Sequence, residues 1–274
     1  MKIKKMNVGV IGGLGVVGSA IVDGMIFIGH NVEVYDIANN SKLSDILDTD
    51  ICFICVPSPS EENTGKCDST IVEETVKNLV ELNYKGIICI KSTVQPGTTR
   101  ILSKKYKIEN ICFVPEFLRE RCATEDFIKN HDICVIGTEN SDTFKILKNA
   151  HGNLPRKFSM VSWEEAEICK YFNNIYNATL VTLANSFYEV CKSFDARYES
   201  VKSTIVKRDH IGDTYLNCNE NLRGFGGMCL PKDLRAISYL CKEREINVDF
   251  FQNILLENEK HPVTVFSGMR EEDE

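Results

Sequence analysis

The chain has 274 residues, of which 43% are hydrophobic and 26% are charged, which is typical of a folded globular protein. The formal net charge of −7 argues against nonspecific binding to nucleic acid or to an anionic membrane surface. No apolar run reaches the roughly 20 residues that span a bilayer, so we expect no membrane partner.

The cysteines and the N-terminus indicate the compartment. The N-terminal segment has basic residues before an apolar run, as a signal peptide does, but its glycine pattern fits a strand, a turn and a helix better. Twelve cysteines in a chain without a secretory signal indicate reduced thiols and a cytoplasmic location. The cysteines give a single CxxC spacing, at Cys52 and Cys55, and not the two pairs of a typical zinc site, so we predict no metal site.

The first predicted elements form a dinucleotide-binding fingerprint. A strand at residues 7–11 leads into a glycine-rich turn and an apolar helix at 19–28, and a second strand at 32–35 ends at Asp36. In such a turn the first glycine makes the tight bend, the second lets the backbone approach a pyrophosphate, and the third allows close helix packing. The residues that we expect to touch the cofactor here are Gly13, Gly15, Val16, Val17, Gly18 and Asp36. Asp36 would bind the adenosine ribose and repel a 2′-phosphate, which favours NAD over NADP.

Further strands are predicted at residues 51–56, 86–91, 111–114 and 133–136, with a helix at 71–82. We expect the strand at 133–136 to be the last in its domain. The alternation of strands and helices predicts an α/β fold with a Rossmann-type, doubly wound, mainly parallel sheet. Val56 and Pro57 follow the third strand, where ligands bind in such sheets, so they join the predicted cofactor site.

The second half of the chain has a helical pattern. Ser162 and Glu165 have the spacing of a capping box. Residues 163–193 contain no proline or glycine, which predicts one long helix, and Lys170 and Asn174 lie one turn apart on it. Shorter helices are predicted at 198–207, 233–242 and 250–260. We therefore predict two domains, a Rossmann-like NAD-binding domain at 1–155 and an all-α domain at 156–274.

Residues 224–233 read GFGGMCLPKD and place Cys229 after a glycine-rich run. Glycines let substrate and backbone approach closely, and a nearby cation such as Lys232 stabilises the nucleophilic thiolate. Asp233 could move protons. The alternative for this segment is a buried cysteine at the turn into a helix.

Six segments of the chain resemble the UDP-glucose/GDP-mannose dehydrogenase family, and within it the enzymes that act on UDP-glucose. In chain order they are GGLGVVG, VPSPS, KSTVQPGTT, VPEFLRE, EEAEICKYFNN and GFGGMCLPKD. The resemblance implies an NAD-dependent oxidoreductase of polysaccharide biosynthesis that converts a nucleotide-sugar CH2OH to a carboxylate. Two hydride transfers would pass through a thiohemiacetal and a thioester on Cys229.

The resemblance also implies roles for single residues. Cys229 would be the nucleophile, Lys170 would stabilise an oxyanion with Asn174 beside it, and Asp233 would activate water. Thr93 and Glu116 would order a water and handle protons, and Thr93 and Glu120 would also lie near NAD. The residues expected to line the substrate are Glu116, Phe117, Leu118, Arg119, Lys170, Asn174, Phe225 and Gly226.

Two departures from the family pattern affect the substrate. The family has a third, UDP-binding domain, and we expect it to be absent, because the chain ends soon after the last predicted helix. His210 stands where the family often has an arginine that reaches a neighbouring subunit, and Arg223 is a candidate to replace that contact. The long helix implies a homodimer or a higher homo-oligomer.

Two other functions stay open at this point. One is a two-electron β-hydroxyacid-type dehydrogenase that uses Lys170. The other is a non-catalytic NAD-binding remnant. The sequence also leaves open which nucleotide sugar is used, although UDP-glucose is favoured.

Overall fold

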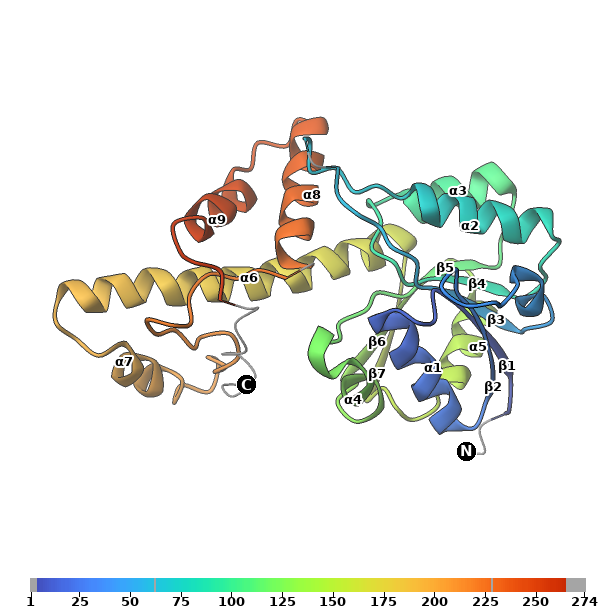
Figure 1. The fold of residues 1–274 in the computed structure, drawn as a ribbon, viewed down its shortest axis with the longest axis horizontal. Coiled ribbons are helices and arrows are strands. Elements are labelled where there is room, and N and C mark those ends of the chain that lie inside the picture. Colours follow the sequence, from blue (N-terminus) through green and yellow to red (C-terminus); the bar gives the residue numbers. More distant parts are fainter. Residues whose placement is uncertain (1–3, 62, 228, 265–274) are drawn as a thin grey trace. The chain divides into compact units, whose positions relative to one another are not determined.

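The computed structural model describes residues 4–61, 63–227 and 229–264, and the chain divides into two compact units (Figure 1). Unit 1 comprises Met1–Pro59 and Asp68–Lys170. Unit 2 comprises Ser60–Cys67 and Tyr171–Glu274. The predicted cofactor-binding residues lie in unit 1, whereas Cys229 and Asp233 lie in unit 2.

Unit 1 is built on one sheet with the strand order β2-β1-β3-β4-β5-β6-β7. The strands are β1 (Asn7–Ile11), β2 (Asn31–Tyr35), β3 (Ile51–Ile54), β4 (Ile87–Ile90), β5 (Ile111–Phe113), β6 (Ile133–Gly137) and β7 (Lys157–Val161). Strands β1 to β5 pair in parallel, β6 pairs with β5 in the antiparallel sense, and β7 is parallel to β6. The central strands β3, β4 and β5 are buried throughout, which explains their continuous apolar sequences.

Helices cover both faces of this sheet (Figure 1). They are α1 (Val16–Ile28), α2 (Thr70–Glu81), α3 (Thr98–Tyr106), α4 (Ala123–Ile128) and α5 (Ser141–His151), with short 3-10 helices η1 (Leu43–Ile46) and η2 (Glu120–Cys122). One apolar cluster joins the sheet to α1, α4 and α5, and a second joins it to α2 and α3. This confirms the predicted doubly wound sheet, because each face carries its own core.

The strand at 133–136 is not the last of the sheet, as we expected, because β7 follows it and pairs with β6. β7 is an edge strand whose residues are half-buried or exposed, so its apolar pattern is weak. It extends the sheet beyond residue 155, at which we expected the first domain to end. Helices α3, α4 and α5 were also not predicted individually.

Unit 2 is helical, as predicted. It contains most of α6 (Trp163–Ser193), together with α7 (Tyr198–Ile205), α8 (Leu230–Glu243) and α9 (Phe250–Asn258). α6 confirms the single long helix, and the capping box forms, because Ser162 N donates to Glu165 Oε2 at 2.7 Å and Glu165 N donates to Ser162 Oγ at 3.3 Å. α6, α8 and α9 share one apolar core. Within the described residues, no helix has the length and apolarity needed to cross a membrane.

Candidate active site

The turn between β1 and α1 depends on a glycine that we did not single out. Gly12 has φ +78°, and a Cβ there would lie 2.6 Å from the carbonyl oxygen of Cys55. Gly13, which we expected to make the tight bend, instead leaves room for β2, because its Cβ would lie 2.5 Å from Cγ1 of Val34. The Gly12-Gly13 pair was the sequence signal for this division of roles.

The other two glycines have the surroundings that a dinucleotide requires. A Cβ on Gly15 would meet only the Gly12 carbonyl oxygen, at 3.5 Å, so this side of the turn is open to a ligand. A Cβ on Gly18 would lie 2.1 Å from the same oxygen, so α1 packs closely on the turn. Gly15 is the N-cap of α1 and no side chain caps this end, which leaves the first backbone N–H groups available to phosphate oxygens.

The strand order places the other predicted cofactor residues beside this turn. β1 lies between β2 and β3, so the chain leaves the carboxyl ends of these strands at a topological switch point. Asp36 follows β2, and its Oδ2 accepts a hydrogen bond from Leu14 N at 3.0 Å. Val56 and Pro57 follow β3. Val16 and Val17 begin α1, where Val16 is exposed and Val17 packs on the core.

Thr93 lies in the loop that follows β4. It is half-buried, and the preceding Ser92 Oγ donates to Val56 O at 2.6 Å. The loop that carries Thr93 is thereby tied to a residue of the predicted cofactor site. Glu120 is exposed at the start of η2.

The loop after β5 brings Glu116 and Lys170 together. Both residues are buried, and the Lys170 ammonium donates a hydrogen bond to the backbone carbonyl oxygen of Glu116. The Glu116 carboxylate accepts from Leu118 N. The lysine that we expected to stabilise an oxyanion therefore contacts the backbone of a predicted substrate loop.

Further along this loop, Arg119 binds Asp126 through its backbone N–H and its guanidinium, at 2.8 to 3.0 Å. Burial by itself raises the pKa of Asp126, but the hydrogen bonds from Arg119 and Asn130 outweigh it and lower the pKa to about 2. Phe117 and Leu118 are half-buried. The guanidinium of Arg119 is held by Asp126, so the backbone of this loop is the part best placed to line a ligand.

Unit 2 pairs two other predicted catalytic residues. Asn174 Nδ2 donates to Asp233 Oδ2 at 2.6 Å, and both side chains are buried. Lys232 forms an ion pair with Asp233 at 3.0 Å. Cys229 is exposed at the N-cap of α8, and its carbonyl oxygen accepts from Asp233 N at 2.9 Å. The alternative of a buried cysteine is therefore wrong, and an exposed thiol lies one helical turn from a buried carboxylate.

Phe225 and Gly226 differ in accessibility. Phe225 is fully buried in the core of unit 2, and its backbone N–H and C=O are hydrogen-bonded to the Asn258 side chain at 2.8 and 2.9 Å. Gly226 is half-buried. Sequence reasoning missed Asn258, which orders the segment before Cys229 from 33 residues away, and no local pattern marks such a contact.

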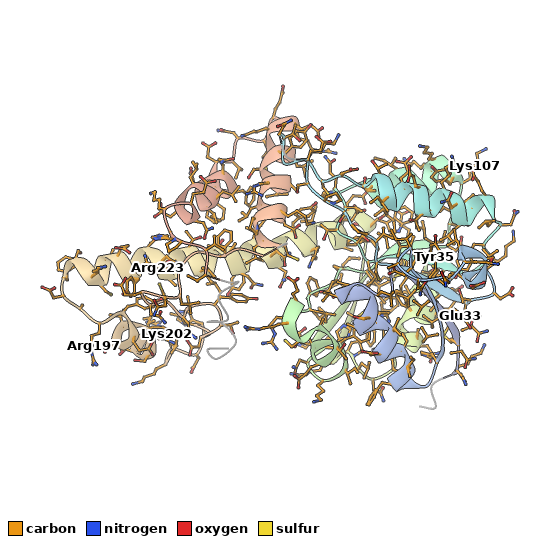
Figure 2. All side chains as sticks on the ribbon, in the orientation of Figure 1. Glu33, Tyr35, Lys107, Arg197, Lys202 and Arg223 are labelled. Carbon is orange, nitrogen blue, oxygen red and sulfur yellow. The ribbon has the colours of Figure 1, made fainter. Side chains whose placement is uncertain are left out.

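Arg223 is not available as the replacement substrate contact that we considered. It is buried beside α6 (Figure 2), where Nε donates to Asn185 Oδ1 at 2.7 Å and Nη2 donates to Glu189. Its guanidinium also lies 4.6 Å from the ring centroid of Tyr188. His210 is exposed.

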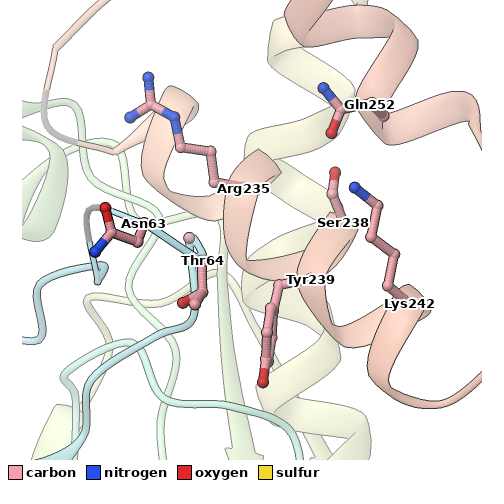
Figure 3. A pocket seen from close by; sticks show the side chains of 8 residues that line it. Asn63, Thr64, Arg235, Ser238, Tyr239, Lys242 and Gln252 are labelled. Carbon is pink, nitrogen blue, oxygen red and sulfur yellow. The ribbon is translucent and has the colours of Figure 1, made fainter.

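A polar pocket in unit 2 lies between the 63–65 loop, α8 and the start of α9 (Figure 3). The residues that line it are Asn63, Thr64, Gly65, Arg235, Ser238, Tyr239, Lys242 and Gln252. None of them is a predicted site residue, and the Arg235 and Tyr239 side chains point in different directions in Figure 3. The pocket therefore has no convergent set of groups, and we assign it no function.

The turn, the sheet and the switch point define unit 1 as a dinucleotide-binding protein of the Rossmann type. A sequence model of the UDP-glucose/GDP-mannose dehydrogenase family, NAD binding domain, matches residues 38–154, and one of the central domain matches residues 164–260. Together they span most of the chain. The chain belongs to the UDP-glucose/GDP-mannose dehydrogenase family and carries its NAD-binding domain.

Individual relatives agree with this placement. A UDP-glucose 6-dehydrogenase of Rickettsia typhi is 29% identical over 231 residues, which cover 81% of this chain and 52% of the relative. The UDP-glucose 6-dehydrogenase AglM of Haloferax volcanii is 30% identical over 248 residues, which cover 83% of this chain and 56% of the relative. The chain spans about half the length of these curated relatives.

Solved structures show the same fold. A UDP-glucose dehydrogenase from Pyrobaculum islandicum superposes with a TM-score of 0.85 at 25% identity, covering 94% of this chain and 69% of that one. A 3-hydroxyisobutyrate dehydrogenase from Mycobacterium tuberculosis gives a TM-score of 0.72 at 13% identity, covering 92% of this chain and 91% of that one. The second likeness is one of fold alone.

Proposed function

We propose that this chain is an NAD-dependent nucleotide-sugar 6-dehydrogenase that oxidises UDP-glucose to UDP-glucuronate. Membership of the family and the names of the relatives support the reaction class. The observation that carries the proposal is the exposed thiol of Cys229, one helical turn before the buried Asp233–Asn174 pair. A two-electron dehydrogenase has no use for a nucleophile in this position.

NAD would be held by unit 1. The open side of the Gly15 turn fits the pyrophosphate, and the Asp36 carboxylate fits the ribose hydroxyls. We assign the remaining contacts to Val16, Val17, Gly18, Val56, Pro57, Thr93 and Glu120, with Gly13 shaping the turn. Bound NAD would accept a hydride in each of the two oxidations.

The protein residues would supply the rest of the chemistry. In the first oxidation, the CH2OH group becomes an aldehyde, and a water ordered by Thr93 and Glu116 takes the hydroxyl proton. The Cys229 sulfur then adds to the aldehyde carbon, and the Lys170 ammonium stabilises the oxyanion of the resulting thiohemiacetal. The second oxidation converts the thiohemiacetal to a thioester. Water activated by Asp233 cleaves the thioester, which releases the carboxylate and returns the thiol.

The backbone of Phe117, Leu118 and Arg119 would line the sugar nucleotide, since the Arg119 guanidinium is held by Asp126. Lys170, Asn174 and Gly226 are proposed as further contacts. The side chain of Phe225 lies in the core. We therefore propose a substrate contact only for the chain segment that contains Phe225, and not for its side chain.

The test is to count NADH formed per UDP-glucose consumed by the wild-type chain and by a Cys229→Ser variant. We expect a ratio of two for the wild type and a near-total loss of the second oxidation in the variant. Cys169→Ser, at a half-buried thiol of α6, is the matched control and should keep the ratio of two. A wild-type ratio of one, or no turnover with any UDP- or GDP-sugar, would refute the proposal.

A second candidate is a two-electron β-hydroxyacid-type dehydrogenase that uses Lys170, and the support for it is the position of Asn174 one turn after Lys170 on α6. In that case Cys229→Ser should leave activity nearly intact. The third candidate, a non-catalytic NAD-binding protein, would show calorimetric binding of NAD without binding of any nucleotide sugar.

We also propose that the chain works as a homodimer in the cytoplasm. The part of α6 in unit 2 presents exposed apolar side chains, among them Phe172 at 71% and Phe187 at 50% exposed. Such a stripe indicates an interface. No disulfide joins the cysteines in the described part of the chain, which agrees with a reducing compartment.

A further inference from the structure

Glu167 of α6 is a buried carboxylate with no role in the chemistry described above. Its side chain is fully buried and accepts hydrogen bonds from Gly97 N at 2.5 Å, Thr99 N at 2.8 Å and Thr99 Oγ1 at 2.6 Å. Among the described residues, no lysine or arginine forms an ion pair with it. Burial raises the pKa of Glu167, although the hydrogen bonds from Thr99 and Gly97 act to lower it. Burial of a carboxylate costs free energy, so this arrangement needs a reason beyond simple packing.

The three donors lie at the start of α3, where the N-cap is Gly97 and no local side chain caps the helix. Helices are ordinarily capped by a serine, threonine, aspartate or asparagine within the same segment. Here a residue 68 to 70 positions further along the chain takes that place. The start of α3 is therefore fixed to α6 rather than to its own loop.

The loop before α3 carries Thr93 and is held at both ends. At its start, Ser92 Oγ donates to Val56 O at 2.6 Å and to Ile54 O at 3.3 Å. At its end, Glu167 holds Gly97 and Thr99. Val94, between the two, is completely buried. The backbone around Thr93 consequently has little freedom to move.

Glu167 also lies one helical turn before Lys170, on the same helix. The Lys170 ammonium binds the carbonyl oxygen of Glu116, in the loop after β5. One turn of α6 thus contacts two loops at the carboxyl end of the sheet, through Glu167 to the loop after β4 and through Lys170 to the loop after β5. These loops carry Thr93 and Glu116.

We propose that Glu167 is a positioning residue of the dehydrogenase site, which fixes the Thr93 loop to the turn of α6 that carries Lys170. The carboxylate itself would not touch substrate or cofactor. The inference rests on the proposed function, because Thr93 and Lys170 are the groups that it would position. A misplacement of reacting groups by about 1 Å can cost on the order of 100-fold in rate.

The test compares Glu167→Gln with Glu164→Gln. The first variant keeps the size of the side chain but replaces an acceptor oxygen with an NH2 group, which cannot accept from Gly97 or Thr99. The control removes a half-exposed carboxylate of the same helix, which binds Arg100 of α3 through Oε1 and Oε2. Both contacts join α6 to α3, but only that of Glu167 reaches the end of the Thr93 loop.

We expect Glu167→Gln to lower kcat by about 10- to 100-fold, as for residues that orient catalytic groups, with the KM for the nucleotide sugar changed less than about twofold. Glu164→Gln should keep kcat within about twofold. If Glu167→Gln lowers only the unfolding temperature and leaves kcat at the wild-type value, Glu167 is a structural cap and the proposal is wrong.

A double-mutant cycle with Thr93→Ala separates positioning from a general loss of stability. If Glu167 acts through the Thr93 loop, its effect on kcat should largely disappear in the Thr93→Ala background. Independent, multiplicative effects of the two substitutions would overturn the proposal.

Calorimetric titration of NAD distinguishes failure of this inference from failure of the proposed function. If the wild type turns over no nucleotide sugar, the proposed function fails. The double-mutant cycle of Glu167→Gln and Thr93→Ala is then measured with the NAD dissociation constant in place of kcat. We then expect Glu167→Gln to weaken NAD binding by about 10-fold, or 1.4 kcal/mol, and to do so much less in the Thr93→Ala background. An unchanged dissociation constant in folded Glu167→Gln would overturn the inference.

Discussion

Three buried polar side chains around the candidate site, those of Asn174, Lys170 and Asp126, each have a specific partner. Asn174 binds Asp233, Lys170 binds the Glu116 carbonyl oxygen, and Arg119 binds Asp126. A buried charge without such a partner would cost several kcal/mol. These contacts therefore set the side-chain positions in the protein before any ligand binds, as a catalytic site requires.

Two histidines in unit 1, the half-buried His131 and the buried His151, predict how stability depends on pH. Burial lowers the pKa of His131 to about 4 and that of His151 to about 3, with a further lowering from the nearby Lys91 charge. An unfolded histidine has a pKa of about 6.5. Between about pH 6.5 and pH 4 the unfolded chain therefore binds more protons than the folded one, and stability falls as the pH is lowered. Each histidine contributes up to about 1.4 kcal/mol per pH unit.

The measurement is urea unfolding from pH 7 to pH 4 for the wild type and for His131→Phe, which keeps a ring beside Phe127. The variant should lose stability with a slope lower by up to about 1.4 kcal/mol per pH unit. His210→Phe, at an exposed histidine, is the control for the exchange of a histidine for phenylalanine. Identical slopes for wild type and His131→Phe would contradict the lowered pKa of His131 in the folded protein.

At the scale of elements, two glycines of the turn between β1 and α1 have different roles, one in cofactor binding and one in the packing of the fold. An alanine at Gly15 would point into open space, whereas an alanine at Gly18 would drive its Cβ into the Gly12 carbonyl oxygen. We expect Gly15→Ala to unfold within about 0.5 kcal/mol of the wild type but to bind NAD at least 10-fold more weakly, a loss of about 1.4 kcal/mol.

Gly18→Ala is the matched comparison, because it should destabilise the fold by about 1–3 kcal/mol through overpacking. Calorimetry with NAD and thermal unfolding of both variants check the two effects. Wild-type NAD affinity in Gly15→Ala would show that the pyrophosphate does not lie against this turn.

Sequence reasoning was most successful for elements with strong local patterns. The run in β3 and the proline-free stretch of α6 predicted their elements, because burial on both faces or a sustained helical pattern leaves a clear signal. β7 was missed, since an edge strand needs few buried residues. Gly12 was missed because the fingerprint marks spacing, whereas the positive φ of Gly12 and the close approach of Cys55 exist only in the folded turn.

At the scale of the whole molecule, the exposed apolar side chains of α6 predict self-association. Phe172 and Phe187 are 71% and 50% exposed, and burial of such side chains is a main driving force for dimers. A glutamate at Phe187 would place a charge in the interface, where desolvation opposes association. We therefore expect Phe187→Glu to raise the dimer dissociation constant by at least 100-fold, about 2.7 kcal/mol.

Sedimentation equilibrium over a range of concentrations measures this constant. Ile205→Glu is the control, because it adds the same charge to another exposed apolar position of unit 2, on α7. A wild-type chain that is monomeric at all concentrations would contradict the predicted dimer.

The sequence by itself determined the class of fold, the NAD fingerprint and the residues that resemble the family site. These properties depend on local spacing, such as Gly13 to Gly18 or Lys170 to Asn174, which helices and turns convert directly into shared positions. Only the tertiary structure decided that Cys229 is exposed, that Arg223 is occupied within unit 2, and that Glu167 reaches Gly97 and Thr99. Contacts between segments many residues apart follow from how elements pack, and a single sequence carries no local pattern that identifies such partners.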